Sequence, residues 1–259
     1  MTAREAIAEA EGRLRAAGVD SPRTDAELIA AYLLGVSRTQ LFSDLDREVA
    51  GLEPLLVRRE AREPLAYVLG EWGFRRLTLR TDARALVPRP ETELVVDRCL
   101  VLLEGVRMPR VLDLGVGSGA IALALKDERP DAQIAGVDES RAALALAREN
   151  AARLGLDVEL REGGIEAARE GWDLVVSNPP YVETLEGLQP ELRYEPEVAL
   201  VGSGLHERIA EAARARALVL EVGDGQAERV AAALEAFAYR DVRITPDLAL
   251  VPRVVEGRR

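Results

Sequence analysis

Strand and helix patterns alternate along the chain from Arg110 onward, and this alternation limits the possible folds more than any other feature of the sequence. Short apolar runs predict strands, and the segments between them carry apolar residues at helical spacing. Short connections between such elements predict a parallel sheet with helices on both faces, which is a doubly wound α/β fold. We expect strands at 111–114, 133–137, 158–161, 173–177 and 217–222, and helices at 120–126, 140–154, 205–215 and 226–237.

The last two expected strands, at 241–245 and 251–256, are separated only by a short loop that contains proline. Because this loop leaves no room for a crossover helix, the last pair should be antiparallel. The expected fold is therefore a doubly wound, mostly parallel seven-stranded sheet whose last strand is antiparallel. This is the arrangement of the common methyltransferase fold.

The chain before this sheet divides into two segments of different character. Residues 1–62 contain apolar residues at helical spacing, with Gly18 and Gly35 as helix stops, and this pattern predicts a small helical bundle. Residues 63–85 have short extended pieces punctuated by glycine, which is typical of a linker or hairpin. We therefore expect an N-terminal helical-bundle domain at 1–62, a linker or hairpin at 63–85 and the sheet domain at 86–259.

A glycine-rich segment, 113–119, lies where the first expected strand meets its helix. Glycines there let the backbone approach a ligand without a clash from Cβ. Asp138 ends the next strand, where a carboxylate can accept hydrogen bonds from both hydroxyls of a ribose. The spacing Gly115-x-Gly117-x-x-Ala120 also fits the fingerprint of dinucleotide-binding dehydrogenases.

Asp113, two residues before the first glycine, favours S-adenosylmethionine over a dinucleotide. In enzymes that use this cofactor, a carboxylate at that place commonly lies near the methionine amino group. We therefore expect a cofactor site for S-adenosylmethionine, with S-adenosylhomocysteine as product, made by Asp113, Gly115, Val116, Gly117, Ser118, Gly119 and Asp138.

The tetrapeptide Asn178-Pro179-Pro180-Tyr181 follows an expected strand, so it should lie at the carboxyl end of the sheet, where ligands bind in this architecture. A carboxamide nitrogen is a poor nucleophile because its lone pair is delocalised into the carbonyl. The side-chain carbonyl of Asn178 and the backbone carbonyl of Pro179 can each accept one N–H of such a group, and the two prolines stiffen the segment. Tyr181 can pack its ring on the planar amide. Positioning rather than proton abstraction would then supply most of the acceleration.

These four residues are the expected catalytic residues, and Asn178 is also expected to border the cofactor. The tetrapeptide indicates methylation of amino or amide nitrogens as a class. It does not separate protein amides from the amino groups of adenine or guanine.

The charge of the chain is unevenly distributed. The formal net charge is −11, and the residues after position 80 include 22 basic and 32 acidic ones. An acidic domain repels phosphate backbones, so no direct nucleic-acid partner is expected, and it attracts basic protein surfaces. An equally simple interpretation is that the acidity keeps the enzyme soluble.

Other features of the composition exclude several classes of protein. No run of 18 apolar residues is present, so no membrane partner is expected. The first 18 residues mix acidic and basic side chains at helical spacing and fit neither a signal nor a transit peptide. Cys99 is the single cysteine, so no internal disulfide and no metal site are predicted. We expect a cytoplasmic protein, with the single histidine, His206, at its surface.

The chain resembles a known family, the protein-glutamine N5-methyltransferases that modify peptide-chain release factors (HemK or PrmC). The resemblance spans nearly the whole chain, and its most family-specific segment is Leu86-Val87-Pro88-Arg89-Pro90-Glu91-Thr92-Glu93. Further matching segments are 62–70, 113–125, 177–182, Tyr194-Glu195-Pro196 with Ala199-Leu200, Glu221-Val222-Gly223 with Gln226, and Pro252-Arg253-Val254-Val255.

The resemblance implies methyl transfer to the glutamine of the Gly-Gly-Gln loop in class-1 release factors. It also implies that the N-terminal bundle helps to grip that protein substrate. Arg89 and Glu91 lie at a helix entry that faces either the substrate pocket or solvent, and they are candidates for the substrate side of the site.

Two alternatives of different classes remain open at this point. One is a nucleic-acid amino methyltransferase acting on adenine N6 or guanine N2, which would share the Asn-Pro-Pro-Tyr chemistry but should present a basic face. The other is a non-catalytic adaptor that uses its helical bundle for binding, and failure to bind S-adenosylmethionine would favour it.

Overall fold

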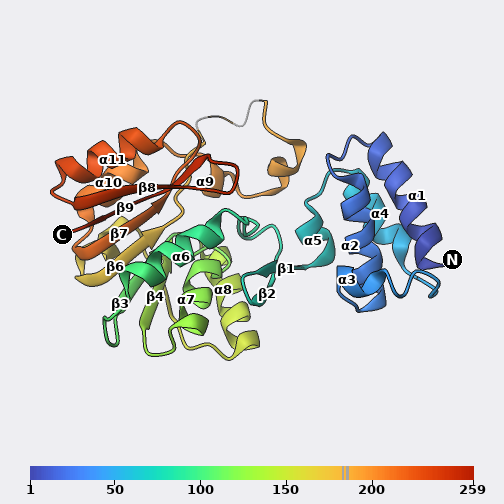
Figure 1. Cartoon of the computed structure of the whole chain (residues 1–259), viewed down its shortest axis with the longest axis horizontal. Helices are drawn as coiled ribbons and strands as arrows, with labels where there is room; N and C mark the ends of the chain where they lie inside the picture. The colour runs from blue at the N-terminus through green and yellow to red at the C-terminus, as the bar shows by residue number, and fades with distance from the viewer. Residues whose placement is uncertain (183, 185–186) are drawn as a thin grey trace. The chain divides into compact units, whose positions relative to one another are not determined.

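The computed structural model describes residues 1–182, 184 and 187–259, and these form two compact units (Figure 1). Unit 1 contains Met1–Glu71 and Gly187–Tyr194, and unit 2 contains Trp72–Glu186 and Glu195–Arg259. Unit 1 therefore extends past residue 62. It also takes in a short segment that lies more than a hundred residues later in the chain.

The first part of unit 1 is helical, as the sequence predicts. A capping box begins the first helix: Thr2 Oγ1 accepts from the Glu5 amide at 3.3 Å, and Glu5 Oε2 accepts from the Thr2 amide at 2.8 Å. Small residues such as Ala6 and Ala10 are fully buried on its inner face, which lets neighbouring helices approach closely. The helices are α1 (Ala3–Ala16), α2 (Pro22–Leu34), α3 (Arg38–Leu41), α4 (Leu52–Glu60) and α5 (Leu65–Leu69).

The second part of unit 1 is the segment 187–194, which ends in the 3-10 helix η2 (Pro190–Tyr194). Glu191 is held by two arginines, Arg59 in α4 and Arg62 just after it. Arg59 Nη1 lies 2.9 Å from Glu191 Oε1, and Arg62 donates to both carboxylate oxygens at 2.7 and 2.8 Å. The Tyr194 hydroxyl donates to the Ala61 carbonyl at 2.7 Å. These contacts fix the segment to the bundle.

Unit 2 opens with a hairpin and a helix and continues as a seven-stranded sheet in the order β5-β4-β3-β6-β7-β9-β8. The first five strands in this order, β5, β4, β3, β6 and β7, pair in parallel. β9 is antiparallel to both β7 and β8, so the predicted fold class is confirmed. The strands are β1 (Glu71–Phe74), β2 (Leu77–Arg80), β3 (Arg110–Leu114), β4 (Gln133–Asp138), β5 (Glu159–Glu162), β6 (Trp172–Ser177), β7 (Ala215–Glu221), β8 (Arg240–Pro246) and β9 (Pro252–Arg258).

Helices cover both faces of this sheet (Figure 1). Successive strand residues point to opposite faces, so Val111 of β3 packs in one core with α6, α7 and α8, whereas Leu112 packs in another with α10 and α11. Both faces are apolar because both are covered, which explains the unbroken apolar runs in the sequence. The helices are α6 (Thr92–Leu102), α7 (Ala120–Glu128), α8 (Arg141–Leu154), η1 (Ile165–Arg169), α9 (Glu197–Leu200), α10 (Leu205–Ala212) and α11 (Ala227–Ala236).

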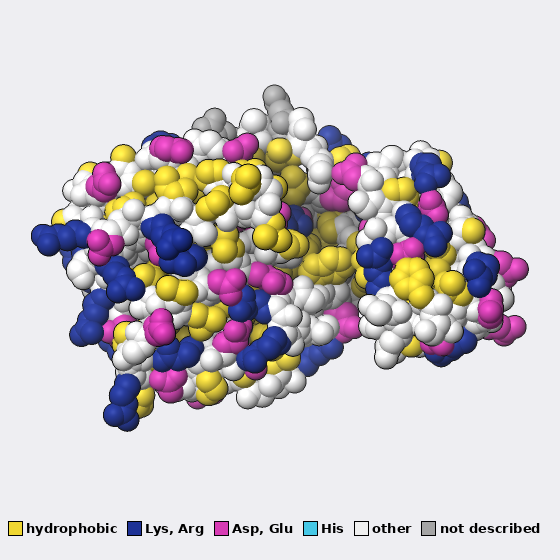
Figure 2. All heavy atoms as spheres, viewed as in Figure 1, with side chains coloured by type: hydrophobic (Ala, Val, Ile, Leu, Met, Phe, Trp, Pro, Cys, Tyr) yellow, Lys and Arg dark blue, Asp and Glu magenta, His cyan; other side chains and the backbone are white. Residues whose placement is uncertain are grey.

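The face of the molecule shown in Figure 2 mixes both signs of charge, with Lys and Arg side chains beside Asp and Glu. Arg84, for example, bridges Asp82 and Glu149 at 2.7 Å each. Among the described residues, no helix is both long enough and apolar enough to cross a membrane.

Candidate active site

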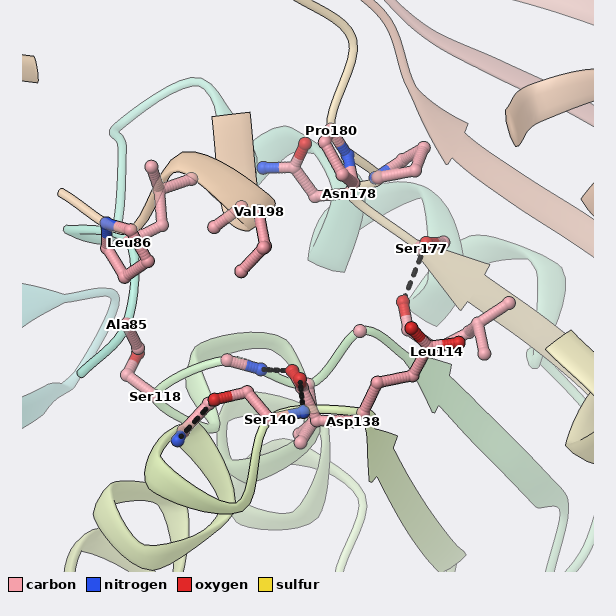
Figure 3. A pocket seen from close by; sticks show the side chains of 18 of the residues that line it. Ala85, Leu86, Leu114, Ser118, Asp138, Ser140, Ser177, Asn178, Pro180 and Val198 are labelled. Carbon is pink, nitrogen blue, oxygen red and sulfur yellow. Dashed lines mark hydrogen bonds between the residues drawn. The ribbon is translucent and has the colours of Figure 1, made fainter. Parts of the chain in front are cut away.

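The site lies between β3 and β6, where the order of the strands in the sheet reverses. β3 pairs with β4 on one side and with β6 on the other, so the loops after β3 and β6 leave the carboxyl edge side by side. The Ser177 hydroxyl at the end of β6 donates to the Leu114 carbonyl at the end of β3, at 2.6 Å. A cavity of about 740 Å³ opens at this edge (Figure 3), which is the place where open α/β sheets bind their ligands.

The glycine loop forms one wall of the cavity. Gly115 and Gly117 have φ values of +78° and +55°, a left-handed backbone that favours glycine, and a Cβ added to either would meet no atom within 4 Å. The loop backbone therefore borders open space, together with Val116 and Ser118. Gly119 differs, because a Cβ there would lie 2.8 Å from the Leu123 side chain, and it does not line the cavity.

Asp138 anchors the loop and faces the cavity beside Ser140 (Figure 3). Its Oδ2 accepts from the Gly117 amide at 2.9 Å and its Oδ1 from the Ser140 amide at 2.8 Å. These bonds fix the carboxylate while each oxygen keeps a further lone pair. A fixed carboxylate with spare acceptor capacity fits the two hydroxyls of a ribose.

Asp113 is placed differently from its neighbours in the motif. It does not line the cavity, and its side chain is buried behind the loop, where Oδ2 accepts from the Ala122 amide at 3.0 Å. Its Oδ1 has no hydrogen-bond partner among the described residues. Burial raises the pKa of Asp113 to about 7, and the nearby Asp138 adds to this, whereas the bond from Ala122 opposes it. Asp113 therefore supports the loop and the start of α7 from inside.

A second part of the cavity wall comes from the glycine pair that follows β5. Gly163 and Gly164, which follow β5, line the cavity together with Leu86 and Ala143, and a Cβ added at Gly164 would lie 2.5 Å from Glu139 Oε1, so the Glu139 side chain would have to move. These residues give this part of the cavity a mostly apolar lining, which suits a base. The sequence signal for this wall is the glycine pair directly after the third expected strand.

Asn178, Pro179 and Pro180 line the cavity on its other side, near Val198 (Figure 3). Tyr181 does not line it. The tyrosine ring lies over Gly223, where an added Cβ would be 2.8 Å from a ring carbon, and burial raises its pKa to about 12. Gln226 completes the support, since its Nε2 donates to the Tyr181 carbonyl at 3.0 Å and its Oε1 accepts from the Gly223 amide at 3.2 Å.

A buried polar chain lies behind Asn178. Asn178 Nδ2 donates to Thr92 Oγ1 at 3.4 Å, and Thr92 Oγ1 donates to Glu221 Oε2 at 2.6 Å. Burial raises the pKa of Glu221 to about 7, although hydrogen bonds from Thr92 and Asn178 act to lower it.

His206 contacts the backbone of Glu221: its Nε2 lies 2.8 Å from the Glu221 carbonyl oxygen. The expectation of a surface histidine was wrong: His206 is 2% exposed, because the apolar face of α10 carries it onto the sheet.

Arg89 and Glu91, the two residues expected on the substrate side of the site, differ in whether they line the cavity. Arg89 lines the cavity and is paired with the buried Glu195, which also accepts from the Val87 amide at 2.9 Å. Glu91 is the residue before α6 and does not line the cavity. Arg208 of α10 also borders the cavity and was missed, because a single arginine in a helix pattern gives no sequence signal.

Two family models match the chain. Residues 5–70 match the PrmC N-terminal domain, and residues 96–192 match the methyltransferase small domain. Among solved structures, the chain resembles the catalytic domain of hMettl16 in complex with MAT2A 3'UTR hairpin 6 (TM-score 0.58, 12% identity, 79% of this chain and 81% of that chain). It also resembles the rRNA methyltransferase RsmC of T. thermophilus in complex with AdoMet and guanosine (TM-score 0.52, 20% identity, 73% and 49%). At these identities the likeness concerns the fold alone.

Several other proteins match this chain at higher sequence identity. A release factor glutamine methyltransferase of Deinococcus radiodurans is 42% identical over 100% of this chain and 99% of its own length. Proteins of the same name from Caulobacter vibrioides and Geobacter sulfurreducens are 39% and 38% identical, each over 99% of this chain and 96% of their own length. The chain therefore belongs to the release factor glutamine methyltransferase family.

Proposed function

We propose that this enzyme transfers a methyl group from S-adenosylmethionine to the side-chain amide nitrogen (N5) of the glutamine in the Gly-Gly-Gln loop of class-1 peptide-chain release factors. The observation that carries the proposal is the shared cavity, in which Asn178 and Pro179 stand opposite a glycine loop anchored by Asp138. When bound, S-adenosylmethionine supplies an electrophilic methyl group and leaves as S-adenosylhomocysteine.

The cofactor side of the site is proposed to use the glycine loop and Asp138. The backbone of Gly115, Val116, Gly117 and Ser118 offers a close approach, and the free lone pairs of Asp138 accept from ribose hydroxyls. Asp113 and Gly119 act from behind, because the first holds the start of α7 and the second packs against Leu123.

The acceptor side is proposed to hold the glutamine amide by its two N–H bonds. The Asn178 side-chain carbonyl accepts one and the Pro179 backbone carbonyl accepts the other, while Pro180 keeps this segment stiff. Fixing both bonds aims the face of the amide nitrogen at the methyl group, so the chain contributes by positioning. Tyr181 contributes by holding the tetrapeptide against Gly223.

The remaining roles follow from the same proposal. Arg89 is a candidate to contact the release factor because it borders the cavity, and Glu91, which does not line the cavity, is a candidate as the residue before α6. Unit 1 is proposed to bind the body of the release factor, and the enzyme is proposed to act in the cytoplasm without a metal, a membrane or direct contact with nucleic acid.

The test is methyl transfer from labelled S-adenosylmethionine to a purified release factor, read by peptide mass. A release factor whose loop glutamine is replaced serves as the matched control. Label on the wild-type loop and none on the control would support the amide as acceptor. Label on neither protein, with cofactor still bound, would contradict the proposal and direct the assay to adenine and guanine amino groups. Failure to bind the cofactor would favour a non-catalytic adaptor.

A further inference from the structure

We propose that Thr92 and Glu221 are positioning residues that fix which way the Asn178 carboxamide faces, so that its oxygen is presented to the acceptor amide. This inference rests on the proposed function. It concerns a side chain in α6 and one in β7, neither of which belongs to the tetrapeptide or to the glycine loop.

The chemistry of the three side chains fixes which group donates and which accepts in each hydrogen bond. A carboxylate can only accept, so the hydroxyl proton of Thr92 must point to Glu221 Oε2, at a distance of 2.6 Å. The Thr92 oxygen is then left with lone pairs and acts as acceptor toward Asn178, and only the Nδ2 side of a carboxamide can donate to it. With Nδ2 used in this way, Oδ1 remains available to accept from the substrate.

Among the described residues, Thr92 and Glu221 are the groups whose side-chain hydrogen bonds with Asn178 select this orientation. The backbone around Asn178 is held by Ser177 on one side and by Gln226 on the other, but these bonds leave the carboxamide free to turn over. A turned carboxamide would place Nδ2 toward the acceptor amide, and two donors would then face each other. The chemistry that Asn178 is proposed to perform therefore depends on a group that distinguishes its oxygen from its nitrogen.

The burial of these side chains also needs an explanation. Thr92 is 4% exposed and Glu221 is 2% exposed, and Glu221 follows the four apolar residues 217–220 at the end of β7. Removing a carboxyl group from water costs stability unless it is well hydrogen-bonded. The fold alone does not require an acid there, because the sheet registers β7 against its neighbours through backbone bonds. A positioning role accounts for the acid.

The experiment compares Thr92→Val, which keeps the shape but loses the hydroxyl, with Thr92→Ser, which keeps the hydroxyl. Both are assayed with a release factor at about pH 8.5, above the raised pKa of Glu221, so that the carboxylate form dominates. We expect Thr92→Val to lower kcat by about 10- to 100-fold with little change in KM or in calorimetric cofactor affinity. Thr92→Ser should recover most of the rate.

Two results would overturn the inference: a Thr92→Val enzyme as fast as the wild type, or a Thr92→Ser enzyme as slow as Thr92→Val. If Thr92→Val does not fold, Glu221→Gln replaces it, because a carboxamide can donate as well as accept and no longer fixes the direction. That variant should also lose kcat with KM unchanged, and an unchanged kcat would overturn the inference.

A readout without catalysis separates this inference from the proposed function. The side-chain amide protons of Asn178 can be assigned by NMR from their loss in Asn178→Asp. They should shift in Thr92→Val and stay close to their wild-type positions in Thr92→Ser. If the wild type methylates no release factor, the proposed function fails while this shift still tests the orientation. Unmoved resonances in Thr92→Val would contradict the inference.

Discussion

Close contacts at single residues explain why the Asn-Pro-Pro-Tyr segment is held in one place. Gly223 lies under the Tyr181 ring with no room for a side chain, and its amide donates to Gln226, which in turn binds the Tyr181 carbonyl. The ring and the backbone of Tyr181 are therefore both fixed by the loop after β7. Residues far from the tetrapeptide in sequence thus control its position.

Gly223→Ala should slow methyl transfer. A Cβ at 2.8 Å from the Tyr181 ring cannot be accommodated unless the ring moves, and the tetrapeptide backbone moves with it. We expect a loss of about 10-fold or more in kcat, because small displacements of positioning groups are costly. Gly12→Ala is the control: it lies in α1, a Cβ there meets nothing within 4 Å, and it should raise stability by about 0.5–1 kcal/mol without changing the rate. Equal rates for Gly223→Ala and the wild type would show that the ring is free to yield.

Glu221 should also make stability depend on pH. Its folded pKa of about 7 lies above the ordinary value of 4.5, so the folded protein binds the proton more tightly than the unfolded chain. This contribution is fully present below about pH 4.5 and is lost as pH rises through 7. The Glu221→Gln variant cannot titrate there, so its stability relative to wild type should increase by about 1–3 kcal/mol between pH 5 and pH 8. Denaturant unfolding of both proteins at the two pH values measures this, and a constant difference would contradict it.

At the scale of elements, the segment 187–194 is the least expected feature. It follows the tetrapeptide in sequence but belongs to the compact unit formed by the N-terminal helices. Glu191 contacts Arg59 and Arg62, and Arg59 is itself only 6% exposed and is also paired with Asp25 at 2.7 Å. Glu191 therefore belongs to the helical unit although it lies only ten residues after Tyr181 in the sequence.

Glu191→Ala should destabilise unit 1 and release this segment. The change leaves Arg59 and Arg62 with fewer partners in a largely buried place, at a cost of about 1–3 kcal/mol. Asp46→Ala removes an acid that is paired with Arg4 at an exposed site and should cost less than about 0.5 kcal/mol. Hydrogen exchange of residues 187–194 together with the denaturation midpoint gives the comparison. Equal midpoints in the two variants would show that the Glu191 contacts add nothing.

Local pattern predicted the elements well and predicted long-range partners poorly. The strand at 173–177 and the helix at 140–154 were found within one residue at each end, since period and glycine stops are local signals. The cavity walls made by Gly115, Asp138 and Asn178 followed from their places at strand ends. The contact of Thr92 with Glu221 spans 129 positions and leaves no such signal. The same holds for the burial of His206, which depends on how α10 packs.

At the scale of the whole molecule, charge should govern encounter with the substrate. The residues after position 80 carry an excess of ten acidic side chains, and such an excess attracts a basic protein substrate. Raising salt shortens the range of this attraction. We therefore expect KM for the release factor to rise by about 10-fold between low and high salt, with kcat for bound substrate little changed. A KM that does not depend on salt would contradict the electrostatic part of the account.

The most direct test of the central claim is the behaviour of Asn178→Ala, measured as the single-turnover rate of methyl transfer to a release factor beside calorimetric affinity for S-adenosylmethionine. The Asn178 carbonyl is proposed to hold the acceptor amide, whereas the cofactor wall is formed by the glycine loop and Asp138. The account predicts a rate at least about 100-fold lower, with cofactor affinity largely intact. Parallel loss of rate and cofactor affinity would show that Asn178 serves the fold or the cofactor, and would contradict the account.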